Sequence, residues 1–171
     1  MTLEQIPLGL PQAIVAAVAL QRLAELAYAR RNTARLRAAG AHEAGARHYP
    51  LFVLLHGTWL AALFALVPPN APIQWWLIGA FAALQAGRLW VIASLGPRWT
   101  TRVIVMPGAP LVRRGPYRWL RHPNYLIVAG EIAVLPLALG AWGIAAFWSA
   151  LNGALIAHRI RVETRALQLS S

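Results

Sequence analysis

Long apolar stretches alternate with arginine-rich connections along this chain of 171 residues. Residues 6–29, 49–67 and 73–95 form apolar stretches that are long enough, as helices, to cross a hydrocarbon core of ~30 Å. Two shorter apolar stretches follow at residues 125–139 and 142–157, and the short glycine-containing link between them permits only an antiparallel helical hairpin. The pattern predicts an all-α, polytopic membrane protein of about five transmembrane helices that ends in a helical hairpin.

The distribution of arginine along the chain predicts its orientation in the membrane. Nearly all of the arginines lie in the connections at residues 30–48 and 96–121 and in the C-terminal tail, whereas the turns at residues 68–72 and 140–143 contain none. Connections on the cytoplasmic side of membrane proteins carry the excess of basic residues. We therefore expect the N-terminus outside, the C-terminus in the cytoplasm and the arginine-rich end on the cytoplasmic face of a bacterial inner membrane.

The composition supports this class and excludes others. The chain is 58% hydrophobic and only 12% charged, whereas about a quarter of the residues in a soluble domain are charged. In a membrane protein a net charge of +11 indicates orientation and contact with anionic lipids, and we predict no nucleic-acid partner. Because cysteine is absent and histidine and glutamate form no close pair at ligand spacing, we predict no metal site. We expect one domain over residues 1–171, with helices at 6–95 followed by a cofactor-binding loop and hairpin at 96–167.

Two charged residues lie inside the first apolar stretch. Arg22 and Glu25 fall on the same helix face as Ala29 and Asn32. Charges at membrane depth normally face the interior of the bundle, pair with each other and belong to functional sites. Arg22 and Glu25 could therefore contact a substrate, or they could only brace the bundle, and both interpretations stay open here.

The segment at residues 113–125 is basic, aromatic and interrupted by prolines. Pro123 disfavours a helical conformation at His122 but suits the first turn of a helix that begins there. The start of a helix offers free backbone N–H groups and the positive end of its dipole to a polar ligand. The alternative is a membrane-surface anchor, in which the arginines meet lipid headgroups and the aromatic rings lie at headgroup level.

A second polar pair follows at the end of the last apolar stretch. Arg159 and Glu163 are four residues apart and share one face of a helix. Because the two arms of a hairpin start and finish on the same side, we expect this pair to lie close to His122 and Tyr125. By itself the pair could also be an ordinary surface ion pair.

The Gly-x-Tyr-x-x-x-Arg-His-Pro-x-Tyr core at residues 115–125, followed by the hairpin and Arg159-x-x-x-Glu163, resembles the isoprenylcysteine carboxyl methyltransferase family. This resemblance spans residues 96–167 and implies an integral membrane enzyme that uses S-adenosylmethionine (SAM). Residues 22–26, 29–32 and 40–50 are similar to a bacterial branch of the family. Members of that branch are associated with type III polyketide synthases and O-methylate alkylpyrones and related lipids.

The resemblance also implies roles for individual residues. Arg159 would face the oxygen of the acceptor, Glu163 would bind the polar end of SAM, and both would be catalytic. Arg22 and Glu25 join Arg159 as candidates on the substrate side. Thr164 departs from the family, which commonly has a second glutamate at this position. The residues implied at the cofactor are Arg102, Ala109, Leu111, Val112, Tyr117, His122, Pro123, Asn124, Tyr125 and Glu163.

The expected function is SAM-dependent methylation of an oxygen atom on a lipophilic acceptor, with an alkylpyrone or related polyketide lipid preferred to a prenylated cysteine. A soluble donor must come from the cytoplasm and a lipid acceptor from the bilayer. Two other classes remain open from the sequence. One is an NADPH-dependent membrane reductase, because membrane sterol reductases share a related His-Pro cofactor region. The other is a non-enzymatic protein that only binds membrane lipids through its arginines.

Overall fold

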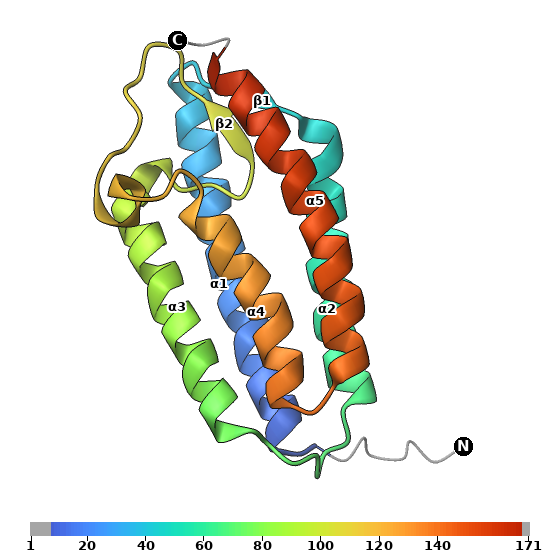
Figure 1. Ribbon diagram of the computed structural model, residues 1–171. Coiled ribbons are helices and arrows are strands. Elements are labelled where there is room, and N and C mark those ends of the chain that lie inside the picture. Colours follow the sequence, from blue (N-terminus) through green and yellow to red (C-terminus); the bar gives the residue numbers. More distant parts are fainter. Residues whose placement is uncertain (1–7, 169–171) are drawn as a thin grey trace.

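The computed structural model describes residues 8–168, so the first two residues of the first predicted stretch (6 and 7) and residues 169–171 lie outside the described part. Five α-helices run side by side as an elongated bundle (Figure 1), which confirms the all-α class. The helices are α1 (Leu10–Ala38), α2 (Tyr49–Leu66), α3 (Trp75–Leu95), α4 (Pro123–Ala138) and α5 (Trp142–Gln168). Between them lie the strands β1 (His42–Ala44) and β2 (Val103–Val105) and the short 3-10 turns η1 (Ala46–His48), η2 (Gly96–Arg98) and η3 (Gly115–Arg118).

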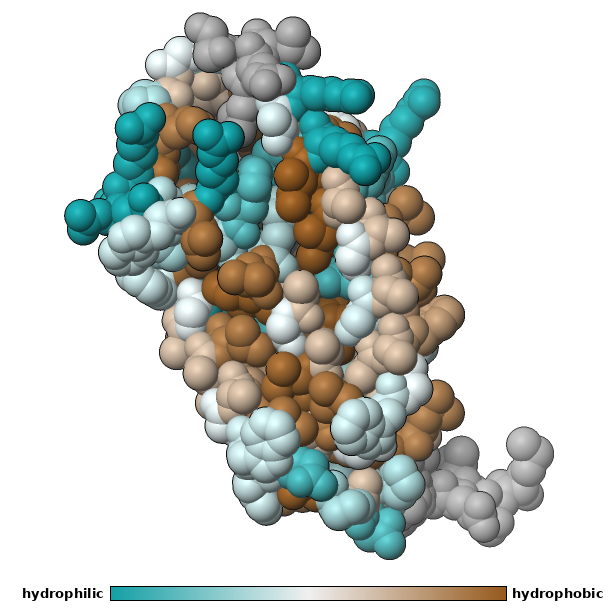
Figure 2. Space-filling model, viewed as in Figure 1, coloured by the Kyte–Doolittle hydropathy of each residue, from teal (hydrophilic) through white to brown (hydrophobic). Residues whose placement is uncertain are grey.

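The bundle has the surface of a polytopic membrane protein, as predicted. The segments Leu10–Ala38, Ala46–Leu66 and Trp75–Arg98 are each long and apolar enough to cross a bilayer. The shorter apolar α4 has 16 residues, and α5 has an apolar first half and a charged second half. Apolar side chains cover the middle of the molecule, while hydrophilic side chains gather at the end that carries the strands (Figure 2).

Large apolar side chains hold the bundle together. Helix α4 packs against both α3 and α5, and α2 packs against α1 and α5. Trp59 and Leu63 of α2 are buried in the main core beside residues of α1, α3 and α4. At one end of the bundle, the backbone N–H of Gln74 donates a hydrogen bond of 2.8 Å to the carbonyl oxygen of Ala138. This bond fixes the start of α3 level with the end of α4.

Three helices differ from the predicted ranges. Helix α1 continues to Ala38 instead of ending at residue 29, and α5 continues to Gln168 instead of ending at residue 157. Arginine is a good helix former, and these extensions meet no proline and no glycine, so the helices extend beyond their apolar parts. Helix α4 begins at Pro123, two residues before the predicted apolar stretch, and runs through Pro136.

A short β-ribbon joins the two arginine-rich connections, which the sequence did not predict. Strands β1 and β2 pair in antiparallel register, with His42 opposite Val105 and Ala44 opposite Val103. The turn after β1 packs closely on α5: Gly45 has a φ of +63°, and a Cβ there would lie 2.7 Å from Cγ1 of Val162. The ribbon therefore lies beside the charged half of α5, at the same end as the start of α4 (Figure 1).

Candidate active site at the arginine-rich end

The start of α4 presents an imidazole and a phenol side by side. Pro123 is the first residue of the helix, and His122 precedes it with a non-helical backbone (φ −132°, ψ 56°). Tyr125 lies in the first turn, and its ring stacks on that of His122 with centroids 5.5 Å apart and an interplanar angle of 23°. His122 is therefore non-helical, as expected before a proline, and its ring lies over the first turn of α4.

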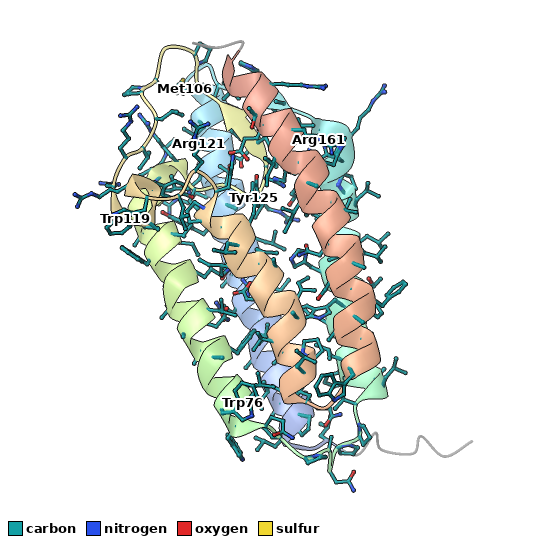
Figure 3. All side chains as sticks on the ribbon, viewed as in Figure 1. Trp76, Met106, Trp119, Arg121, Tyr125 and Arg161 are labelled. Atoms are coloured by element: carbon teal, nitrogen blue, oxygen red, sulfur yellow. The ribbon has the colours of Figure 1, made fainter. Side chains whose placement is uncertain are left out.

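Helix α5 brings a guanidinium and a carboxylate to the same place. The hydroxyl of Tyr125 donates a hydrogen bond to Oε2 of Glu163 and accepts one of 2.9 Å from Nε of Arg159. Nδ1 of His122 lies 3.7 Å from the same Glu163 oxygen. Figure 3 places Tyr125 where α4 begins, beside α5. The hairpin therefore brings these four predicted residues together, and we call them the rim cluster.

Arg159 is oriented by its neighbours but not neutralised by them. Its side chain is buried, with 7% of the residue exposed, and Nη2 donates a hydrogen bond of 2.7 Å to the carbonyl oxygen of Thr101. Its guanidinium carbon lies 5.1 Å from the centroid of the Phe52 ring and 5.7 Å from that of Tyr125. Among the described residues it forms no ion pair with a carboxylate. Its positive charge is therefore not paired with a carboxylate within residues 8–168, and its guanidinium has N–H donors beyond those used in these hydrogen bonds.

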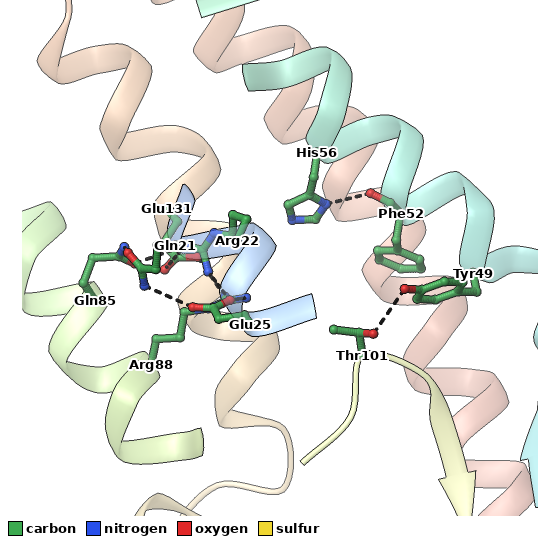
Figure 4. A network of polar contacts seen from close by, with 10 residues as sticks. All are labelled: Gln21, Arg22, Glu25, Tyr49, Phe52, His56, Gln85, Arg88, Thr101 and Glu131. Carbon is green, nitrogen blue, oxygen red and sulfur yellow. Dashed lines mark hydrogen bonds and ion pairs between the residues drawn. The ribbon is translucent and has the colours of Figure 1, made fainter. Parts of the chain in front are cut away.

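The β-ribbon supports Arg159 from the other side. The hydroxyls of Tyr49 and Thr101 lie 3.2 Å apart (Figure 4), and the guanidinium of Arg102 stacks 4.0 Å from the centroid of the Tyr49 ring. Arg102 also donates a hydrogen bond of 2.7 Å to Glu43, which pairs in addition with Arg37. Arg102 thus braces the segment that carries the Thr101 carbonyl, and its predicted place at the edge of the cofactor pocket stays a prediction.

Tyr117 and Asn124 add two polar groups beside the rim cluster. Burial, and after it the nearby Glu163 carboxylate, raise the pKa of the Tyr117 hydroxyl above its ordinary value, so Tyr117 remains a neutral hydroxyl. The turn η3 that carries Tyr117 packs directly on α3, because a Cβ at Gly115 would lie 2.0 Å from Oγ of Ser94. Oδ1 of Asn124 is buried and has no hydrogen-bond partner among the described residues.

The loop residues that the resemblance placed at the cofactor lie in the irregular connection between β2 and η3. The Leu111 side chain is exposed, and Val112 lines a hollow at the end of α3. Ala109 forms a turn through a backbone hydrogen bond to Met106. No hydrogen bond connects these three residues to the rim cluster within residues 8–168, so their role at the cofactor stays a prediction.

Arg22 and Glu25 lie in a separate network inside the bundle (Figure 4). Arg22 pairs at 2.8 Å with both Glu25 and Glu131, and Arg88 pairs with Glu25 at 2.8 Å and with Glu131 at 3.0 Å. We call these four residues the interior network. It joins α1, α3 and α4, and in the described part of the chain no hydrogen bond or ion pair links it to Arg159 or Glu163. The structure thus shows a bracing contact, and a substrate-side role for Arg22 and Glu25 stays a prediction.

The sequence contained a signal for the interior network but not for the residues behind Arg159. Arg88 and Glu131 are charged residues inside apolar stretches, and their signs complement Glu25 and Arg22. Thr101 contributes a backbone carbonyl and Phe52 a ring face. Neither contribution depends on a residue type that sequence patterns single out.

The fold and the rim cluster define a polytopic helical membrane protein with a polar site at one end of its bundle. The family model of the isoprenylcysteine carboxyl methyltransferase (ICMT) family matches residues 77–169, which include the whole rim cluster. The chain is also 38% identical, over 159 residues, to the uncharacterized protein YpbQ of Bacillus subtilis (strain 168), and this match covers 91% of the chain and 95% of that protein. No solved structure matches the chain. The chain belongs to the ICMT family and is thus a membrane methyltransferase by family.

Proposed function

We propose that this protein is a SAM-dependent methyltransferase that acts on an oxygen atom of a lipophilic acceptor. The observation that carries this proposal is the rim cluster, in which an unneutralised arginine and a partly exposed glutamate meet at the edge of an apolar bundle. Membership of the ICMT family supports the reaction class, because members of this family use SAM as methyl donor.

The residues at the rim fit SAM. The unpartnered Oδ1 of Asn124 and the carboxylate of Glu163, whose side chain is 28% exposed, are acceptors for amino and hydroxyl groups. The stacked rings of His122 and Tyr125 offer aromatic faces to a cation. When bound, SAM supplies an electrophilic methyl group on a positively charged sulfur.

Arg159 is suited to hold the acceptor. Of the five N–H donors of its guanidinium, one bonds to Tyr125 and one to the Thr101 carbonyl, which leaves charged donors for an enolate, phenolate or carboxylate oxygen. Glu163 can accept the proton of a neutral hydroxyl acceptor, and an acidic enol needs no base. The contribution of the protein is then positioning and exclusion of water.

For the acceptor we propose an alkylpyrone or related polyketide lipid, because residues 22–26, 29–32 and 40–50 resemble the branch that methylates such lipids. The alternative within the family is a prenylated cysteine. We further propose that the rim faces the cytoplasm of a bacterial inner membrane. Both arginine-rich connections and the charged half of α5 lie at this end of the bundle, in agreement with the positive-inside rule.

The test is cofactor binding followed by transfer. We expect SAM, or its demethylated product, to raise the melting temperature of the detergent-solubilised protein, and the Glu163→Ala and His122→Ala variants to lose this shift. Arg161→Ala, which changes an exposed arginine two residues from Glu163, is the control that keeps it. Radiolabelled SAM incubated with a lipid extract of the host then identifies the acceptor. Absence of any shift with SAM or its product, or a shift with NADPH alone, contradicts the proposal.

A further inference from the structure

A hollow of about 520 Å³ opens at the end of α3, where the connection after β2 folds back on the bundle. We call it the arginine hollow. Three of its six lining residues are arginines, and none of these six described residues is acidic. They are Leu95, Pro97, Arg98, Val112, Arg113 and Arg114.

The three arginines that line the hollow have no carboxylate partner within residues 8–168. Nη1 of Arg98 donates a hydrogen bond of 2.7 Å to the carbonyl oxygen of Pro110, and Nε of Arg114 donates one of 2.6 Å to that of Ser94. These carbonyls fix the two side chains but leave their charges uncompensated. Arg113 is exposed and forms no hydrogen bond or ion pair with any described residue. A ligand that meets these three guanidinium groups must therefore carry negative charge, and phosphate suits their geometry.

The remaining wall of the hollow is apolar, and its position matches the headgroup level of a bilayer. Trp90 and Trp119 lie next to it, with ring centroids 6.0 Å apart, and both are at least half exposed. Exposed Trp76 marks the opposite end of α3 (Figure 3). A helical rise of ~1.5 Å per residue puts Leu95 about 29 Å from Trp76, close to the ~30 Å thickness of a hydrocarbon core. Trp90 lies about 21 Å from Trp76 by the same rise, so exposed tryptophans stand toward both ends of α3, as aromatic belts do at the two interfaces of a membrane.

We propose that the arginine hollow binds the phosphate of an anionic phospholipid, with the glycerol and first acyl carbons against Leu95 and Val112. Basic pockets at the membrane interface recognise anionic headgroups in this way. A free inorganic phosphate shares the charge but has nothing to place on the apolar wall. The proposal concerns residues outside the rim cluster and does not depend on the methyl transfer, and it assigns to the lipid Val112, which the resemblance implies at the cofactor.

The test measures lipid binding to the purified full chain in a neutral detergent. Dioleoyl phosphatidylglycerol and dioleoyl phosphatidylcholine are titrated separately, with the melting temperature and the bound lipid by native mass spectrometry as readouts. We expect phosphatidylglycerol to bind more tightly, and Arg113→Gln combined with Arg98→Gln to weaken it about tenfold or more. Arg161→Gln on α5 is the matched control and should change the affinity less than about twofold.

Arg113→Gln alone is the second variant. Because Arg113 forms no hydrogen bond or ion pair with a described residue, misfolding cannot explain a fall in lipid affinity in this variant. A selective fall in phosphatidylglycerol affinity in both hollow variants supports the proposal. Equal binding of the two lipids, an equal loss in Arg161→Gln, or displacement of the lipid by equimolar inorganic phosphate overturns it. A parallel fall in SAM affinity in Arg113→Gln also overturns it, because the hollow would then belong to the cofactor site.

Discussion

The protein contains two clusters of arginine and glutamate that are built differently. In the interior network, both carboxylates pair with both guanidinium groups, and no side chain is more than 11% exposed. In the rim cluster, Arg159 bonds to a hydroxyl and a carbonyl, and Glu163 is 28% exposed. In the interior network every charge is paired with charges of opposite sign. In the rim cluster the positive charge of Arg159 has no carboxylate partner among the described residues, and part of its hydrogen-bonding capacity is unused.

This difference follows from where the charges lie. Uncompensated charge inside a membrane is expensive, so the interior residues persist only because two arginines and two glutamates satisfy each other. At the rim, water lowers that penalty for Glu163, which is 28% exposed, whereas the buried Arg159 is held by a hydroxyl and a carbonyl that leave part of its hydrogen-bonding capacity for a ligand. Arginine and glutamate thus brace the bundle in the interior network, and we propose that they bind a ligand at the rim. The two places differ in whether every charge is paired.

The largest effect is expected from breaking the interior network. Glu131→Leu leaves two arginines with one carboxylate and should lower the free energy of unfolding by about 3–5 kcal/mol. Equilibrium unfolding in mixed detergent micelles measures this loss. The double variant Arg88→Met and Glu131→Leu removes one charge of each sign and should be more stable than Glu131→Leu alone. A single variant as stable as the unchanged protein would show that the network does not brace the bundle.

The rim cluster should respond in the opposite way. Glu163→Gln should lower the rate of methyl transfer about 100-fold or more, because under the proposed function it removes the carboxylate that holds SAM and accepts the proton of the acceptor. Its free energy of unfolding should stay within about 0.5 kcal/mol of the unchanged protein, since the group is partly exposed. Transfer assays and unfolding are compared with those of Arg161→Gln. Retained activity together with a large loss of stability would remove the distinction between the two clusters.

Tyr125→Phe sharpens the comparison, because it removes only the hydroxyl that links Arg159 to Glu163. We expect kcat to fall about tenfold or more, because the hydroxyl makes hydrogen bonds to two charged groups. The KM for SAM should change little, since the aromatic ring remains. Steady-state kinetics separates the two constants, and a change confined to KM would contradict the linking role.

The smallest effect is expected at the β-ribbon. Glu43→Gln weakens the pairing with Arg102 and so loosens the segment that carries the Thr101 carbonyl. We expect the KM for the acceptor to rise a few-fold while SAM binding is unchanged, because the Arg102 side chain is 35% exposed and solvent screens part of its pairing with Glu43. Glu43→Asp keeps the charge and should restore part of the affinity. Equal losses in both variants would indicate that the charge at residue 43 is not what positions Arg159.

Much of the fold could be predicted, because the lengths of the apolar stretches can be counted in the sequence and match membrane-spanning helices. The hairpin logic also placed Tyr125 beside Glu163 correctly, since two helices joined by a short link must run antiparallel. The β-ribbon could not be predicted, because strands of three residues show no periodicity. The pairing of Arg22 with Glu131 depends on which helices are neighbours, and a single sequence does not state that. The Thr101 carbonyl carries no side-chain signal at all.

The shortness of α4 has a consequence for how a lipid reaches the site. The hydrogen bond from Gln74 to Ala138 keeps α3 and α4 level at one end, so the difference in their lengths appears at the other. At ~1.5 Å per residue, the first residue of α4 lies about 7 Å nearer the middle of the bundle than the last residue of α3. His122 and Tyr125 therefore lie nearer the middle of the bundle than the last residue of α3 does. We expect the proposed lipophilic acceptor to present its oxygen there while its hydrocarbon tail stays among the lipid chains.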